Sequence, residues 1–266
     1  MKALKHVFKT VRTESPILYG VVLFHFTLAA LCLIGWALDS RMLAGLNIWV
    51  KPMKFAISGG IYVLTSGFLI TFYPFSRKRK NIVNNIISWT MVLEISIVFL
   101  QATRGVRSHY NQSSLFDGIL FGSMGILIGI IVFTMVFFIV ETIRLRLKTP
   151  RSVQWGILLG WLVVFFGSWV GGQMIGQMSH NVGVADGGEG IPWLNWSTIA
   201  GDLRVAHFFG LHGIQIIPLF AVVLTKKLNA SKMVKNLSVI LFGLLYASWI
   251  AFTFYQAKQG MPLVRI

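Results

Sequence analysis

The chain has 266 residues, of which 55% are hydrophobic and 12% are charged, and its mean hydropathy is +0.72. Soluble globular domains average about 25% charged residues, so this composition excludes an ordinary soluble domain. The formal net charge of +16 would indicate nucleic-acid binding in a soluble protein. In a membrane protein, however, basic residues first report how the chain is oriented across the bilayer.

Seven apolar runs are long enough to cross about 30 Å of hydrocarbon, which takes about 20 residues of helix. The sequence therefore predicts an all-α polytopic membrane protein with seven transmembrane helices, folded as a single integral membrane domain over residues 1–266. The predicted helices, in chain order, cover residues 17–38, 52–73, 82–103, 115–141, 153–176, 205–225 and 237–256.

The Lys and Arg residues alternate in density along the chain. Segments 1–16, 74–81, 142–152 and 226–236 each carry four of the 24 Lys and Arg residues. Cytoplasmic segments attract positive charge, so the pattern predicts the N-terminus inside and the C-terminus outside. The basicity then follows from topology, and no nucleic-acid partner is expected; the lipid bilayer is the expected partner.

The first apolar run also contains the single cysteine, Cys32, so an intrachain disulfide and a Cys-rich metal site are excluded. His25 lies in the middle of the same run, and no polar residue lies three or four positions away. We interpret it as a core histidine whose hydrogen bonds are satisfied.

Polar side chains inside the predicted helices carry the functional hypotheses, because such residues are costly in lipid. Glu94 and His212 both lie roughly 10–15 Å from the predicted outer end of their helices. We therefore expect them to meet, together with Gln173, in one chamber in the outer half of the bilayer, as catalytic or proton-carrying groups. Further polar and basic residues of this half are candidates for binding a ligand or cofactor: Lys54, Arg104, Gln173, Arg204 and Gln215.

Three histidines from separate segments and one aspartate lie near the predicted outer surface. Side chains that converge from different helices are what a zinc or haem site requires. The candidate metal ligands are His109, His180, His207 and Asp202.

The run 115–141 contains four glycines that share one side of a helix, Gly118, Gly122, Gly125 and Gly129. Such a stripe is typical of close packing between small residues of two membrane helices. It could instead form a groove for a flat ligand such as haem, a quinone or an acyl chain.

Three stretches, 51–56, 101–109 and 201–212, resemble an uncharacterised family of bacterial seven-helix multipass membrane proteins. The resemblance extends over most of the chain and implies a bacterial plasma (inner) membrane as the location, but no activity. A rhodopsin-type retinal protein is disfavoured, because the run 237–256 has no lysine for a Schiff base. The histidine inventory is similar to that of intramembrane zinc hydrolases related to ceramidases, but the spacing differs, so this likeness is an analogy of fold.

Four functions stay open at this point. The first is binding of a metal or haem cofactor, with His212 or the interfacial histidines as ligands. The second is transport or reception of a small anionic or amphipathic solute, with Glu94 as a proton-coupling site and Lys54, Arg104 and Arg204 as attracting charges. The third is a lipid hydrolase or transferase at the outer leaflet, and the fourth is a scaffold. A transporter also needs a polar path through the inner half, and the sequence shows no polar cluster there.

Overall fold

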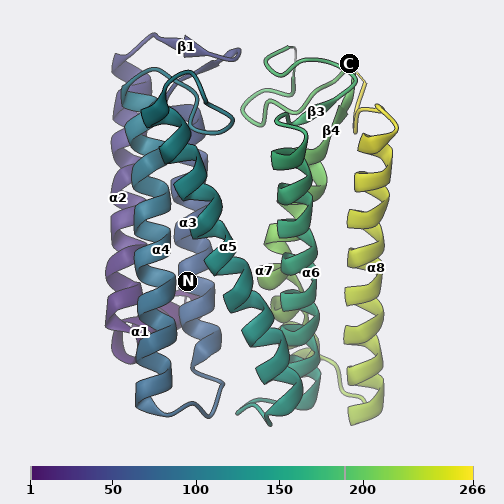
Figure 1. The fold of residues 1–266 in the computed structure, drawn as a ribbon. Coiled ribbons are helices and arrows are strands. Elements are labelled where there is room, and N and C mark those ends of the chain that lie inside the picture. Colours follow the sequence, from purple (N-terminus) through teal and green to yellow (C-terminus); the bar gives the residue numbers. More distant parts are fainter. Residues whose placement is uncertain (1, 189, 266) are drawn as a thin grey trace. The chain divides into compact units, whose positions relative to one another are not determined.

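A computed structural model describes residues 2–188 and 190–265, and in these residues the chain forms eight α-helices (Figure 1). Seven of them are long and apolar enough to span a membrane, which confirms the predicted all-α, seven-span fold class. The helices are α1 (Lys2–Glu14), α2 (Pro16–Leu38), α3 (Val50–Ile70), α4 (Arg77–Thr103), α5 (Leu115–Arg144), α6 (Arg151–Gly176), α7 (Leu203–Lys227) and α8 (Lys232–Lys258).

Two short antiparallel hairpins interrupt the helical chain. Strand β1 (Met42–Leu43) pairs with β2 (Leu46–Asn47) after α2, and β3 (Asn181–Val182) pairs with β4 (Gly201–Asp202) before α7. The second hairpin closes the long loop that follows α6.

Several helices extend beyond the apolar runs that predicted them. α4 begins at Arg77, where the Ser76 side chain accepts a hydrogen bond from the Arg79 amide. α8 begins after Ser231, which caps the Val234 amide in the same way. Hydropathy therefore locates the hydrocarbon-spanning part, while N-cap serines start these helices in the charged segments.

Helix α1 was expected only as a charged tail. It packs against α2 and α3, and Val11 is fully buried. The fit depends on Gly67 of α3, where an added Cβ would lie 3.0 Å from the Val11 side chain. Lys80 and Glu14 add an ion pair of 3.3 Å. At 13 residues α1 is too short to span a bilayer.

The chain divides into two compact units, which are described separately. Unit 1 comprises Met1–Thr71 and Phe75–Thr134, and unit 2 comprises Phe72–Pro74 and Met135–Ile266. The core of unit 1 draws on α2, α3, α4 and α5, with the buried cluster Leu28, Ala29, Ala56, Ile95, Val98 and Met124. We refer below to the α1 end and the β1–β2 end of unit 1.

In unit 2, α6 and α7 pack backbone to backbone. An added Cβ on Gly167 of α6 would lie 2.6 Å from the carbonyl carbon of Gly210 on α7, and one on Gly156 would lie 2.6 Å from the Ala221 side chain. By contrast, a Cβ at any glycine of the α5 stripe, Gly118 to Gly129, would meet no atom within 4 Å among the described residues. The close packing of small residues therefore lies on α6, at glycines that the sequence interpretation did not single out.

Candidate functional site

Glu94 is the buried carboxyl group of unit 1. It lies on α4, nine positions before the end of the helix, which places it about 14 Å from that end. Its exposed fraction is 5%, and its Oε2 atom has no hydrogen-bond partner among the residues that the structure describes. The positive charge of Lys51, at the start of α3, acts on this carboxylate. Glu94 is thus buried inside the helix bundle, and its Oε2 atom can accept a further hydrogen bond.

Five other buried polar atoms of unit 1 share this condition. Within the described part of the chain they have no hydrogen-bond partner either: His25 Nε2, the Tyr62 hydroxyl, Ser66 Oγ, Asn84 Oδ1 and Ser88 Oγ. In the described residues of unit 2, only Asn181 Oδ1 and Gln215 Oε1 are in this state. Because nearly all buried polar groups in native proteins are hydrogen-bonded, the concentration in unit 1 calls for a physical explanation.

His25 is only half satisfied. Its Nδ1 lies 2.9 Å from the Val21 carbonyl oxygen. Because a carbonyl oxygen can only accept, Nδ1 donates the proton, and Nε2 of the neutral ring carries a lone pair. That nitrogen faces Gly59 of α3, where an added Cβ would lie 2.9 Å away. The expectation of a satisfied core histidine is therefore correct for Nδ1 and wrong for Nε2.

Arg104, a candidate for binding a ligand, pairs within unit 1. Its Nη1 lies 2.5 Å from Asp117 Oδ1, and the Gln101 amide donates to the same oxygen at 2.9 Å. The guanidinium also lies over the Phe116 ring, 5.0 Å from its centroid. Arg104 therefore joins the end of α4 to the start of α5. Of the other candidates in unit 1, Lys54 is half-buried on α3.

His109, the candidate metal ligand of unit 1, lies in the loop between α4 and α5. Its Nδ1 is 3.0 Å from Ser108 Oγ, and its ring lies edge-on to Phe55, 5.4 Å between centroids. These contacts fix the ring against the first turns of α3.

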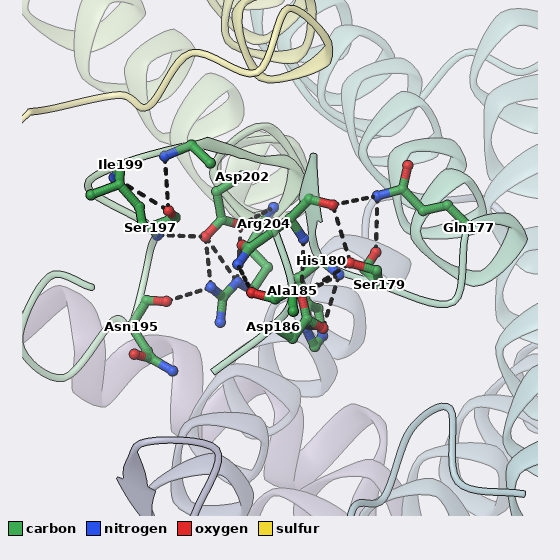
Figure 2. A network of polar contacts seen from close by, with 12 residues as sticks. Gln177, Ser179, His180, Ala185, Asp186, Asn195, Ser197, Ile199, Asp202 and Arg204 are labelled. Carbon is green, nitrogen blue, oxygen red and sulfur yellow. Dashed lines mark hydrogen bonds and ion pairs between the residues drawn. The ribbon is translucent and has the colours of Figure 1, made fainter. Parts of the chain in front are cut away.

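In unit 2, Asp202 and Arg204 stabilise the long loop before α7 (Figure 2). Asp202 is 1% exposed and accepts hydrogen bonds from the Ser197 amide at 2.8 Å and from the Arg204 amide and Nε at 2.9 Å. Arg204 also donates to the Asn195 carbonyl. Asp202 was predicted as a metal ligand and Arg204 as a ligand-binding group. In the structure their side chains bond to each other and to the backbone of this loop.

A second cluster of hydrogen bonds in this loop, called the Asp186 knot below, centres on the Asp186 carboxylate (Figure 2). The sequence did not lead us to expect it. Its carboxylate lies 2.7 Å from His180 Nδ1 and accepts from the backbone amides of His180 and Asn181. Burial alone would raise the pKa of Asp186, but these hydrogen bonds hold that pKa well below its usual range. The available signal was an aspartate six residues after His180 in a glycine-rich loop.

The two histidines of α7 bond to backbone. His207 Nδ1 lies 2.7 Å from the Gly167 carbonyl oxygen, and its ring covers Gly171, where an added Cβ would lie 2.9 Å away. His212 Nδ1 lies 2.7 Å from the Phe208 carbonyl oxygen, and the two rings are 4.2 Å apart. Gln215 lies on the same helix, and its buried Oε1 has no partner in the part of the chain that the structure describes. Gln173 is half-buried on α6.

The predicted metal site receives no support. Among residues 2–188 and 190–265, no group of three or more His, Cys, Asp or Glu side chains could hold a metal ion. Of the four candidate ligands, His109 belongs to unit 1 and the other three belong to unit 2. The shared chamber of Glu94, Gln173 and His212 likewise joins residues of both units, and it stays a prediction.

Unit 2 contains a buried polar network that the sequence interpretation did not foresee. The Tyr73 hydroxyl lies 2.5 Å from Thr142 Oγ1 and accepts from Trp161 Nε1 at 3.1 Å. Gln154 donates to the carbonyls of Thr142 and Leu145, at 2.8 Å each. These contacts connect the end of α5 to the start of α6, and every polar atom in them has a partner.

Comparison of the chain with models of protein families, with curated proteins and with solved structures finds no match. The seven spans make it a multipass integral membrane protein.

Proposed function

We propose that this protein is a proton-coupled membrane transport protein for a small anionic solute, with Glu94 as the group that binds and releases the proton. The observation that carries the proposal is the Glu94 carboxyl group, 5% exposed inside a membrane-spanning bundle with one oxygen unpartnered among the described residues. Carboxyl groups at such depths are costly to keep, and in pumps and transporters they serve as proton relays.

The charge near Glu94 favours an anion as the cargo. Lys51 and Lys54 begin α3, and Lys51 acts on the carboxylate. Arg104 and Arg204, the other attracting charges considered, are already bound to Asp117 and Asp202. We assign the lysines of α3 to the solute because they lie on a helix that packs against α4 and because Lys51 acts on the Glu94 carboxylate. The proposal retains a cytoplasmic N-terminus and a bacterial plasma membrane.

The other functions have less support. A metal or haem cofactor, and a lipid hydrolase that relies on a metal-bound water, both need a convergent donor set, and the described residues provide none. A scaffold leaves the unpartnered polar atoms of unit 1 unexplained, since each one costs free energy without stabilising a contact.

Proton uptake into proteoliposomes tests the proposal. The purified chain is reconstituted with a pH-sensitive dye inside the vesicles, and uptake is measured under a potassium-diffusion potential, with and without succinate or inorganic phosphate outside. We expect anion-stimulated uptake by the wild type, and a rate on the order of a hundredfold lower for Glu94→Gln. The matched control is Glu141→Gln, because Glu141 is also a buried carboxylate of a spanning helix but is paired with Arg144 at 2.7 Å.

Two outcomes would contradict the proposal. One is that, with succinate and with phosphate alike, vesicles containing the wild type take up protons no faster than protein-free vesicles. The other is equal uptake by Glu94→Gln and Glu141→Gln.

A further inference from the structure

The buried polar atoms of unit 1 form a ladder along three helices. On α4, Glu94, Met91, Ser88 and Asn84 follow one another at intervals of three or four positions, and on α3, Gly59, Tyr62 and Ser66 do the same. Residues at these intervals share one face of a helix. The two faces meet at Gly59, where an added Cβ would lie 3.2 Å from the Met91 methyl group.

The ladder extends from Glu94 towards the α1 end. His25 lies about one turn from Glu94 towards the α1 end. Its Nε2 and the Met91 methyl group both lie next to Gly59, and Met91 is one turn before Glu94 on α4. Ser88 and Tyr62 lie a turn further on, and Asn84 follows. The Asn84 amide donates to Ser15 Oγ at 3.0 Å, at the junction of α1 and α2. From Glu94 to Asn84 the ladder covers about 15 Å of helix axis.

The polar members of this series each have a buried atom without a hydrogen-bond partner among the described residues. The Tyr62 hydroxyl lies near the hydroxyls of Ser66 and Thr134 without meeting hydrogen-bond geometry. A single buried polar atom without a partner can have a purely local cause. A series of them on adjacent turns is what a file of bound water requires, since a buried water makes two to four hydrogen bonds to polar partners.

We propose that a file of water molecules connects Glu94 to the α1 end of unit 1, and that His25 relays protons within it. This inference rests on the proposed function and supplies the inner half of the path, which the sequence interpretation did not find.

The relay step conserves both protons and charge. The water next to Glu94 takes the proton of the protonated Glu94 carboxyl group and gives one of its own protons to the lone pair of His25 Nε2. This leaves a Glu94 carboxylate, a neutral water and an imidazolium, while Nδ1 keeps its bond to Val21. The same Nε2 then releases the proton to the water on the Ser88 side, and the ring returns to its neutral form. The titratable members of the series on the neighbouring helices are Tyr62 on α3 and Glu94 on α4; α3 also carries Lys51, which acts on Glu94, and Lys54.

Gly59 is the structural requirement for this site. Because a methyl group there would lie 2.9 Å from His25 Nε2 and 3.2 Å from the Met91 methyl, Gly59→Ala displaces the ring from the position in which Nε2 would meet the water file. Gly20 on α2 serves as the matched control, since an added Cβ at that position meets no atom of the described residues within 4 Å.

Water-edited solid-state NMR of the histidine-labelled protein in lipid bilayers tests the file directly. The His25 ring signals are assigned by their loss in His25→Gln. We expect magnetisation from water to reach the His25 ring about as fast as the exposed His6 ring, and to be lost in Gly59→Ala but not in Gly20→Ala. Transfer to His25 that is much slower than transfer to His6 in the wild type would overturn the inference.

Proton uptake separates this inference from the proposed function. We expect His25→Gln, which keeps a hydrogen-bonding side chain but cannot relay a proton, to lower uptake at least about tenfold. If His25→Gln takes up protons at the wild-type rate while Glu94→Gln is inactive, the relay is overturned and the proposed function stands. Wild-type uptake by Glu94→Gln would overturn the proposed function, whatever the NMR result.

Discussion

Units 1 and 2 differ in how many of their buried polar atoms lack a hydrogen-bond partner among the described residues. In unit 2, Gln154 and Tyr73 have a partner for each polar atom, and Asp186 and Asp202 collect several donors each. In unit 1, polar atoms on α2, α3 and α4 are buried and remain unpartnered among the described residues. Paired groups stabilise a fold, whereas orphaned groups weaken it. Unit 2 therefore uses polarity for structure, and unit 1 retains polarity for another purpose.

The largest expected effect comes from the packing of unit 2. Gly167→Ala places a methyl group 2.6 Å from the Gly210 backbone, which cannot move aside as a side chain can. We expect a loss of about 3 kcal/mol in the free energy of unfolding, near the upper end for an overpacked core. The measurement is thermal unfolding in detergent.

The control for this prediction is Gly125→Ala in unit 1. The added methyl on α5 meets no described atom within 4 Å, and alanine favours helix over glycine by up to about 1 kcal/mol. The melting temperature should stay equal or rise. A lower melting temperature for Gly125→Ala than for Gly167→Ala would contradict this account of the packing.

A matched pair of tyrosines tests the difference in polarity. Tyr73→Phe leaves the buried Trp161 Nε1 and Thr142 Oγ1 without their shared partner, so we expect a cost of about 1–3 kcal/mol. Tyr62→Phe removes a hydroxyl that is buried and unpartnered among the described residues and leaves no protein group unpaired, so its cost should stay below about 1 kcal/mol. Chemical unfolding of the two variants measures both values.

If the two substitutions cost the same, the contrast between the units fails. If Tyr62→Phe proves the more costly, Tyr62 has a partner in the membrane that accounts for its hydroxyl. Proton uptake by this variant would then show whether that partner belongs to the relay.

The smallest effect is the response of the Asp186 knot to acid. The folded-state pKa of Asp186 lies below the value of about 3.9 for an unfolded chain. Its hydrogen bonds therefore contribute fully above that value, and their contribution is lost as pH falls towards the folded-state pKa. Amide hydrogen exchange of His180 and Asn181, corrected for intrinsic rates, should rise between pH 5 and about pH 3.

In Asp186→Asn this exchange should already be faster at pH 5 and should change little on acidification. Exchange in the wild type that is independent of pH below about 4 would mean that the Asp186 carboxylate does not hold the start of β3.

The fold was predictable because the thickness of a bilayer sets the length of each apolar run. Helix α1 escaped the prediction because its stability comes from Val11 against Gly67, a tertiary contact that periodicity does not reveal. The N-cap serines Ser76 and Ser231 extended α4 and α8 into charged segments, where hydropathy gives no signal.

The candidate site was predictable in part. Glu94 stood out because a carboxylate within an apolar run is expensive. His25 was misread, because the sequence cannot show that only one ring nitrogen meets an acceptor. The pairing of Arg104 with Asp117, and of His180 with Asp186, depends on how loops fold back on themselves. Spacing alone does not predict such contacts.

The glycine seam between α6 and α7 also limits how unit 2 can move. Two helices whose backbones touch have no layer of side chains that could absorb a slide or a roll, so α6 and α7 should behave as one stiff body. α8 meets α7 through stacked rings, with 3.9 Å between the centroids of Phe220 and Phe242. Any internal adjustment of unit 2 is therefore expected in the layer of side chains between α7 and α8 rather than between α6 and α7.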